Sequence, residues 1–219
     1  MNSSLIQLLV LAGVAVFLIL KLRSVLGTRE GFEKPPVSRD DGTPSLRRAT
    51  PPALDGPDQD IADHVADNPP AAAALKAMKA AEPAFSVGEF LRGARGAYEM
   101  ILMAFEKGEL DRIRGFLSDE VAATFAQAIN ARETQGLTTE TTFLGIRELT
   151  LEDAEFDAAS RTGEITVRFV AEITSVVRNK AGEVVEGAAG EVKRQRDSWT
   201  FARKMGASDP NWQLVATGD

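Results

Sequence analysis

Two stretches at the C-terminal end of the chain alternate between apolar and polar residues, which restricts them to neighbouring β-strands. Residues 197–203 read Asp-Ser-Trp-Thr-Phe-Ala-Arg, and residues 211–217 read Asn-Trp-Gln-Leu-Val-Ala-Thr. A repeat of two is the spacing of side chains on one face of a strand. Glycine, aspartate and proline lie between the stretches and are typical of a turn. Because Trp199 and Trp212 are the only tryptophans of the chain, we expect this hairpin to supply much of the aromatic surface of a buried face.

Upstream of the strands, the apolar residues recur at helical spacing. Ser86 and Glu89 have the spacing of a capping box, in which each side chain bonds a free backbone N–H at a helix start. This pattern predicts a helix that continues to about Phe105. A second helix is predicted from Ser118 to Gly136, because acidic residues follow the serine and glycine is a common helix terminator.

The residues between the second helix and the hairpin also alternate, so they predict further strands. The clearest is 164–177, and 143–150 precedes it. Residues 154–159 show a weaker pattern, and glycines interrupt a strand predicted at 184–190. The first strand of the hairpin is predicted to begin at Glu191. Helices followed by an antiparallel meander indicate an α+β fold rather than a βαβ one.

The N-terminal residues are predicted to anchor the chain in a membrane. Residues 5–20 carry no charge, and the apolar stretch extended to Leu26 is about 20 residues long, enough for one crossing. A cleaved signal peptide is the alternative, but it would have a basic start and a small-residue cleavage site. Here the basic residues follow the apolar core, which by the positive-inside rule places the rest of the protein in the cytoplasm. The anchor is assigned to residues 1–26, with Leu5, Leu9, Phe17, Leu20, Lys21 and Arg23 as its characteristic residues.

Residues 27–71 are predicted to form a flexible Pro-rich linker, since prolines and glycines interrupt any periodic pattern and little apolar surface is present to bury. The only histidine, His64, falls in this linker and is interpreted as a solvated side chain. The alanine-rich run 71–81 has high helix propensity. It could lie on a membrane surface or pack as a lead-in helix. The domain that follows is placed at 72–219, with its packed part beginning near Phe85.

Composition excludes several classes of function. The chain has no cysteine, so it has neither disulfides nor a thiolate site. A net charge of −7 argues against a nucleic-acid-binding protein. No metal or cofactor is predicted, because the sequence shows no ligand cluster. Tyr98, Glu172 and Asp197 are the conceivable catalytic groups. Since Tyr98 has core spacing and strand carboxylates usually face solvent, we predict that the protein is not an enzyme.

The order of these elements and their amino-acid sequences resemble a known family. Residues 85–105 and 116–125, together with the hairpin ending at 217, resemble the C-terminal domain of the mitochondrial inner-membrane translocase subunit Tim44. The resemblance covers about residues 72–218. It implies a cone-like domain of the nuclear transport factor two superfamily, with helices packed on a curved antiparallel sheet around an apolar pocket. It also implies peripheral association with inner membranes, with a preference for cardiolipin, and the tethering of partner proteins there.

The chain departs from the mitochondrial members at its N-terminus. It carries a predicted transmembrane anchor where they carry a transit peptide and a chaperone-binding region. The chain therefore resembles the bacterial branch of the family, and tethering of an import motor is not expected.

Two candidate sites follow. The resemblance implies a pocket, whose lining would come from Tyr98, Phe143, Phe169, Trp199, Phe201 and Trp212, unless these residues form a closed core. A basic cluster could contact anionic lipid headgroups or an acidic partner segment, unless it is a solvated strand face paired with carboxylates. Residues 85–219 carry 16 basic and 22 acidic side chains, a net charge of −6, which opposes strong binding to anionic membranes. The cluster comprises Lys193, Arg194, Arg196, Arg203 and Lys204.

These observations predict a membrane-anchored adaptor that docks partner proteins at the cytoplasmic face of the bacterial inner membrane, in protein transport or membrane-protein assembly. The predicted partners are the inner membrane, anionic phospholipid, and membrane or transport-related proteins, and nucleic acid is excluded. The alternative is a protein of the same fold with a pocket for lipid or a small molecule. An isomerase or dehydratase would be the catalytic form of that alternative.

Overall fold

A computed structural model describes residues 58–65 and 68–218. All of them belong to one compact unit, Pro52–Asp219. The predicted transmembrane anchor and most of the predicted linker lie outside the described residues. Among the helices that the structure describes, none has the length and apolar character needed to cross a membrane.

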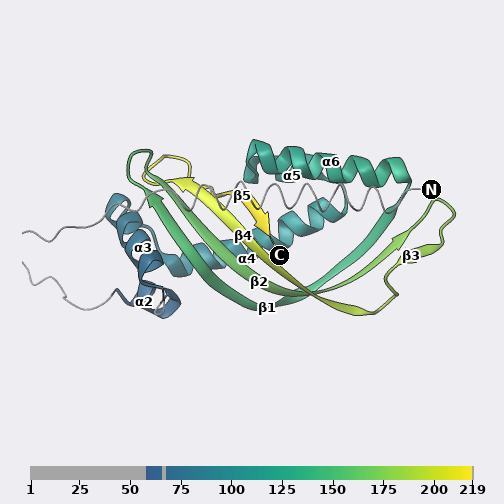
Figure 1. Ribbon diagram of the computed structural model, residues 1–219, viewed down its shortest axis with the longest axis horizontal. Coiled ribbons are helices and arrows are strands. Elements are labelled where there is room, and N and C mark those ends of the chain that lie inside the picture. Colours follow the sequence, from purple (N-terminus) through teal and green to yellow (C-terminus); the bar gives the residue numbers. More distant parts are fainter. Residues whose placement is uncertain (1–57, 66–67, 219) are drawn as a thin grey trace, which may run out of the picture. The chain divides into compact units, whose positions relative to one another are not determined.

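An antiparallel sheet forms the body of the domain (Figure 1). Its strands are β1 (Thr138–Asp157), β2 (Thr162–Arg178), β3 (Val184–Glu186), β4 (Val192–Lys204) and β5 (Gln213–Gly218). The order across the sheet is β1-β2-β4-β5, and β3 pairs with β2 beyond the start of β4. The α+β class predicted from the sequence is confirmed. The more specific expectation of a cone of the nuclear transport factor two superfamily stays a prediction.

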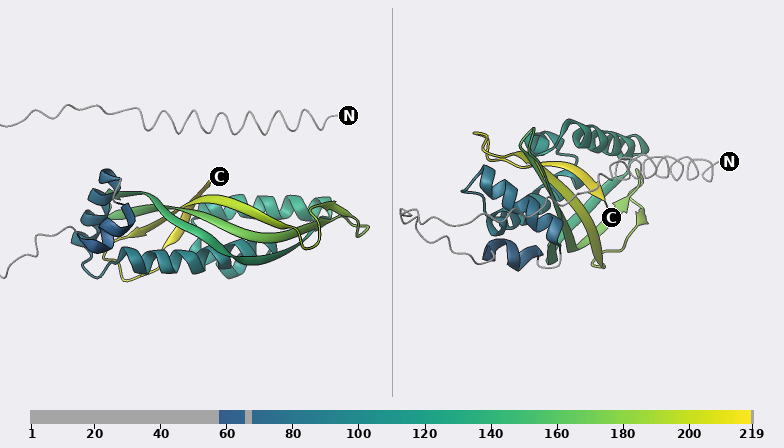
Figure 2. Two further views of the ribbon diagram at one scale, coloured as in Figure 1. Left: turned by 90° about the horizontal axis from the view of Figure 1, so that it is seen from below. Right: turned by 60° about the vertical axis from the view of Figure 1, so that its left-hand side comes forward.

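The helices precede the sheet in the chain. They are α2 (Gln59–Val65), α3 (Pro69–Ala81), α4 (Val87–Glu106), α5 (Leu110–Ile113), a 3-10 turn (Arg114–Phe116) and α6 (Asp119–Gln135). Helices α2 and α3 gather at the end of the sheet where β1 turns into β2, and β3 lies at the opposite end (Figure 1, Figure 2). Helix α4 packs against the sheet, and Tyr98 on its buried side stacks on Phe169 of β2 with ring centroids 4.4 Å apart.

The predicted helix starts are confirmed by their serine caps, but the Glu89 half of the capping box is not formed among the described residues, because the Glu89 side chain pairs with Arg92. The Ser86 hydroxyl accepts a hydrogen bond from the backbone N–H of Glu89, and the Ser118 hydroxyl accepts one from Val121. Gly136 ends α6 in the left-handed region at φ 65°, a conformation that glycine adopts without strain.

The strand predictions were right for 164–177 and for the hairpin, but two others need correction. Residues 143–150 and 154–159 are not separate strands, because β1 runs without a break from Thr138 to Asp157, where it ends two residues before the predicted end. Its register shifts at three places, and each shift interrupts the alternation on which the prediction depended. The strand predicted at 184–190 ends at Glu186. Gly187 follows at φ 77°, where a Cβ would lie 2.1 Å from the Ser175 carbonyl oxygen.

The folded unit begins earlier than predicted. Helix α2 lies within the stretch interpreted as linker, yet its Ile61 and Val65 are buried. In α3, Leu75 and Met78 have no exposed surface. These apolar side chains pack into the main core, so residues 58–65 and 68–71 are part of the domain rather than a linker, and α3 is a docked lead-in helix. His64 is exposed on α2.

Candidate functional site

Three of the six predicted pocket residues form a closed aromatic cluster. The Tyr98 ring lies 4.4 Å from Phe169 and 4.6 Å from Trp199, measured between centroids. All three side chains are at most 5% exposed. They line neither of the two clefts described below, so they form part of the core that positions α4 on β2 and β4.

The other predicted tryptophan, Trp212, lies in an open cleft between α4 and the β4–β5 hairpin. Phe90 of α4 meets the Trp212 ring at 4.7 Å and the Phe201 ring at 6.0 Å, in both cases edge to face. Phe85 completes the aromatic floor, 5.9 Å from Trp212. The cleft has a volume of about 370 Å³, and Phe116 lines it from the 3-10 turn.

The cleft exists because α4 presents small residues on this side. Gly93, Ala94 and Ala97 recur at helical spacing along the wall of the cleft. A Cβ at Gly93 would meet no atom within 4 Å, so that position faces open space. The opposite wall comes from the loop before β5, residues 210–212. A groove with small residues on one wall and aromatic rings on its floor can accept an apolar group.

Arg203 closes one end of the cleft. Its side chain is 8% exposed and its Nη2 donates to the Glu82 carboxylate at 2.9 Å. The guanidinium also lies over the Trp212 ring, 5.2 Å from the centroid. Its Nε is buried and has no hydrogen-bond partner among the described residues. Arg203 is thus an anchored cation with one unused donor.

Glu82 holds that cation in place. Its second oxygen accepts the Gly206 N–H at 2.7 Å. Burial would raise the pKa of Glu82, but the hydrogen bonds from Arg203 and Gly206 outweigh it and hold the pKa below its usual value. A carboxylate held ionised in an ion pair is poorly suited to proton transfer near neutral pH. Glu82 therefore serves in the cleft as the ion-pair partner of Arg203.

The residues considered as catalytic groups lie outside the cleft and have partners of their own. Tyr98 donates a 2.5 Å hydrogen bond to Asp197. Burial is the main cause that raises the pKa of Tyr98 far above its usual value, and the Asp197 carboxylate raises it further. Glu172 pairs with Arg147 at 2.6 Å and with Arg194 at 3.4 Å, and the bond from Arg147 lowers its pKa. These contacts are those of structural residues.

A second groove lies on another side of α4. Gly96, Met100 and Met103 of α4 face Phe143 of β1 across a space of about 630 Å³. Phe143 also contacts Tyr98 at 6.3 Å between ring centroids, so it connects this groove to the aromatic cluster. Met100 is one of the exposed large apolar residues of the domain.

Comparisons with known proteins place this chain in a family. The family model described as Tim44-like domain matches residues 71–219, well over half of the chain. The chain belongs to the Tim44-like domain family. Human mitochondrial import inner membrane translocase subunit TIM44 is 28% identical over 137 residues. That match covers 61% of this Tim44-like chain but only 30% of the human protein.

A solved structure that aligns with part of this chain comes from a chloroplast protein. It is the intermembrane space region of the chloroplast protein ARC6, with a TM-score of 0.40 and 10% identity. The alignment covers 58% of this chain and 94% of that chain.

The basic residues of the Tim44-like domain do not form one surface. Lys193 and Arg194 lie near the start of β4, whereas Arg203 and Lys204 lie at its end, roughly 30 Å away at the rise of a strand. Neighbouring residues also point to opposite faces of the sheet. Lys193 pairs with Glu186 and Arg194 with Glu172, while Arg196 is exposed beside them. The structure thus separates the predicted cluster along β4, and Lys193, Arg194 and Arg203 are each held in an ion pair.

Sequence reasoning missed most of the cleft of this Tim44-like protein. Phe85 and Phe90 were visible only as apolar residues near a helix start. Glu82 and Arg203 are 121 residues apart, and no local pattern links them. Among residues 58–65 and 68–218, no group of three or more His, Cys, Asp or Glu side chains is placed to hold a metal ion.

Proposed function

We propose that this Tim44-like protein is a membrane-associated adaptor that docks a partner protein in the cleft between α4 and the β4–β5 hairpin. The observation that carries the proposal is the cleft itself. Phe90 of α4 packs edge to face on Trp212 to form an apolar floor, and the small residues of α4 leave the space above it unfilled. Arg203 is held in an ion pair with Glu82, which favours recognition over acid–base chemistry by that pair.

Family membership supports a role in protein transport at a membrane. The human relative is named as a subunit of a translocase of an inner membrane. The finer parts of the proposal come from this sequence. The apolar residues 5–26 would anchor the chain in a bacterial inner membrane with the domain on the cytoplasmic side. An anchor raises the local concentration of the cleft near membrane partners, so a weak contact suffices.

A second function is favoured by the size of the cleft. A volume of about 370 Å³ lies within the range of pockets that hold small ligands, so an acyl chain or a metabolite would fit. The separation of the basic residues along β4 argues against a broad contact with anionic lipid headgroups. The ionised, paired state of Glu82 argues against the isomerase or dehydratase form of this alternative.

Site-specific photo-crosslinking in native membranes tests the proposal. The full chain would carry a photoreactive residue at Asn211 on the rim of the cleft, or at Thr150 on the opposite face of the sheet as a matched control. We expect a discrete protein adduct from position 211 and none from position 150. Equal adducts from both positions, or an adduct with lipid alone at position 211, would refute docking of a protein in the cleft.

A further inference from the structure

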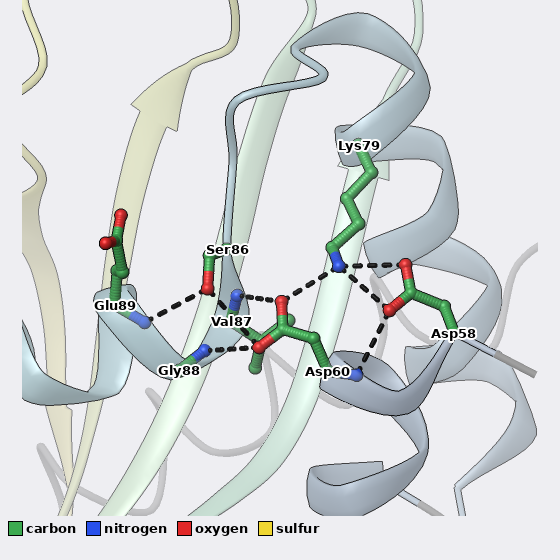
Figure 3. A network of polar contacts seen from close by, with 7 residues as sticks. All are labelled: Asp58, Asp60, Lys79, Ser86, Val87, Gly88 and Glu89. Carbon is green, nitrogen blue, oxygen red and sulfur yellow. Dashed lines mark hydrogen bonds and ion pairs between the residues drawn. The ribbon is translucent and has the colours of Figure 1, made fainter.

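Asp60, in the first turn of α2, caps a different helix. Its carboxylate accepts the backbone N–H groups of Val87 and Gly88, each at 2.8 Å, in the first turn of α4 (Figure 3). The Ser86 hydroxyl lies 3.3 Å from the same carboxylate and donates to it. A helix start has unpaired N–H groups and a partial positive charge, so a carboxylate stabilises it.

Lys79 of α3 ties this cap to the rest of the domain. Its Nζ lies 2.8 Å from Asp60 and 2.8 Å from Asp58, and its side chain is only 20% exposed (Figure 3). Burial would raise the pKa of Asp60, but the bonds from Lys79 and from the two backbone N–H groups lower it to about 2. The carboxylate is therefore ionised at every physiological pH, and the network joins α2, α3 and α4.

Helix α2 has no stability of its own. It is seven residues long, and helices that short do not persist in water without tertiary contacts. Its contacts are the network around Asp60 and the burial of Ile61 and Val65, which are 2% and 5% exposed. Docking and helix formation are therefore one event, which makes α2 a two-state element.

The surface on which α2 docks is also a wall of the cleft. Ser86 caps α4 through the Glu89 N–H, and both residues line the cleft. Phe85 and Phe90, which contact Trp212, lie immediately on either side of this capped turn. The turn that Asp60 stabilises is thus the turn that positions the aromatic floor.

We propose that α2 is a strap whose docking sets the shape of the cleft, so that the N-terminal part of the chain regulates the docking site. When α2 is docked, Asp60 fixes the first turn of α4 and holds Phe85 and Phe90 against Trp212. When α2 leaves, Val87 and Gly88 lose their acceptor, the turn frays and the floor loosens. Residues 1–57 join the domain at Asp58, directly before α2. A force on those residues, or a partner bound to them, would therefore act on α2 before it acts on the sheet.

This inference rests on the proposed function for the identity of what binds in the cleft. The coupling of α2 to the cleft can be tested without a partner protein. Hydrogen exchange of the full chain in detergent would be compared for the wild type, Asp60→Ala and Asp63→Ala. Asp63 is an exposed residue of the same helix whose side chain bonds only Gln59 among the described residues, so its variant is the matched control. Loss of an acceptor worth about 1.4 kcal/mol corresponds to a tenfold change in opening. We therefore expect on the order of tenfold faster exchange in residues 59–65 and 85–90 for Asp60→Ala, and none for Asp63→Ala.

Two results would overturn the proposal. Faster exchange in α2 with no change at 85–90 would show that the cleft is independent of the strap, and no change in α2 would show that Asp60 does not hold it. Faster exchange throughout β2 in Asp60→Ala would indicate that the whole domain had been destabilised. Asp60→Asn would then be used instead, because its amide keeps one acceptor oxygen and should give a smaller increase in exchange in the same two segments. Failure of this test would leave docking in the cleft untouched, since photo-crosslinking measures docking separately.

Discussion

The hydroxyl of Tyr98 on α4 donates a 2.5 Å hydrogen bond to the carboxylate of Asp197 on β4, 99 residues further along the chain. This bond lies at the edge of the cluster formed by Tyr98, Phe169 and Trp199. Gln195 supplies a second donor to Asp197 at 3.1 Å. The bond therefore fixes the lateral position of α4 on the sheet, and with it both grooves that line α4.

Replacing Tyr98 by phenylalanine tests that role. The ring keeps its stacking while Asp197 loses a donor in a partly buried site, so we expect a loss of about 1–3 kcal/mol in the free energy of unfolding. Urea denaturation measures it. Asp197→Asn, whose amide oxygen still accepts from the hydroxyl, should cost less. An unchanged unfolding midpoint in Tyr98→Phe would contradict a structural role for the bond.

The main elements of this fold could be predicted because their signals are local. Ser86, Ser118 and Gly136 mark helix ends by their own capping chemistry, and the alternation around Trp199 identifies its strand directly. Helix α2 could not be found in this way. Its stability comes from Asp60 and Ile61 contacting residues of other elements, which no window of neighbouring sequence contains.

Arg203→Met should destabilise the domain by leaving Glu82 without its ion partner. Removing one member of a buried pair costs about 3–5 kcal/mol, and we expect about 2–3 kcal/mol here because the Glu82 side chain is still 22% exposed. Chemical denaturation of the variant gives the value. In a double-mutant cycle with Glu82→Gln, the double variant should lose less than the sum of the two single variants. Strictly additive losses would show that the pair is not coupled.

Leu75→Ala distinguishes a docked α3 from a helix free to lie on a membrane. Leu75 has no exposed surface, so its truncation should lower the free energy of unfolding by about 2–5 kcal/mol. Lys76→Ala, one position along on the exposed side, is the control and should change it by less than about 0.5 kcal/mol. Thermal and urea unfolding of both variants measure the difference. Equal stabilities would contradict docking of α3 in the core.

The pKa of Asp60 predicts acid sensitivity of α2. Since that pKa falls from 3.8 to about 2 on folding, the unfolded chain binds the proton first. The ionised carboxylate therefore stabilises the fold above about pH 4, and this contribution is lost between about pH 4 and pH 2. Its size is up to about 2 kcal/mol before solvent screening is taken into account. The neighbouring charged groups are Lys79, which stays protonated, and Asp58.

Unfolding of the wild type and Asp60→Asn across that range isolates the contribution of Asp60 from those of Glu82, Glu172 and Asp157, whose pKa values are also lowered. The stability difference between the two proteins should shrink as the pH falls. A difference that does not vary with pH would contradict the assigned role of Asp60.

The candidate site was less predictable than the fold. Trp212 and Phe201 were expected in a pocket, and they do line the cleft. Tyr98 and Phe169 were expected beside them but lie in the closed core, because helical or strand spacing shows which side is apolar and not whether another element covers it. The open part of the surface depends on Gly93, whose missing side chain leaves no pattern in the sequence.

Gly93 also provides the most direct test of whether a partner docks in the cleft. The Gly93→Leu side chain would fill the cleft, whereas the Gly96→Leu side chain would enter the second groove. A Cβ at either position meets no atom within 4 Å, so neither change causes a clash at Cβ. Both changes also raise the helix propensity of α4. Each would be combined with the photoreactive residue at position 211 in the full chain in native membranes. We expect Gly93→Leu to reduce the protein adduct at least tenfold and Gly96→Leu to leave it unchanged. Retention of the adduct in Gly93→Leu, or its equal loss in both variants, would contradict docking of a partner in the cleft.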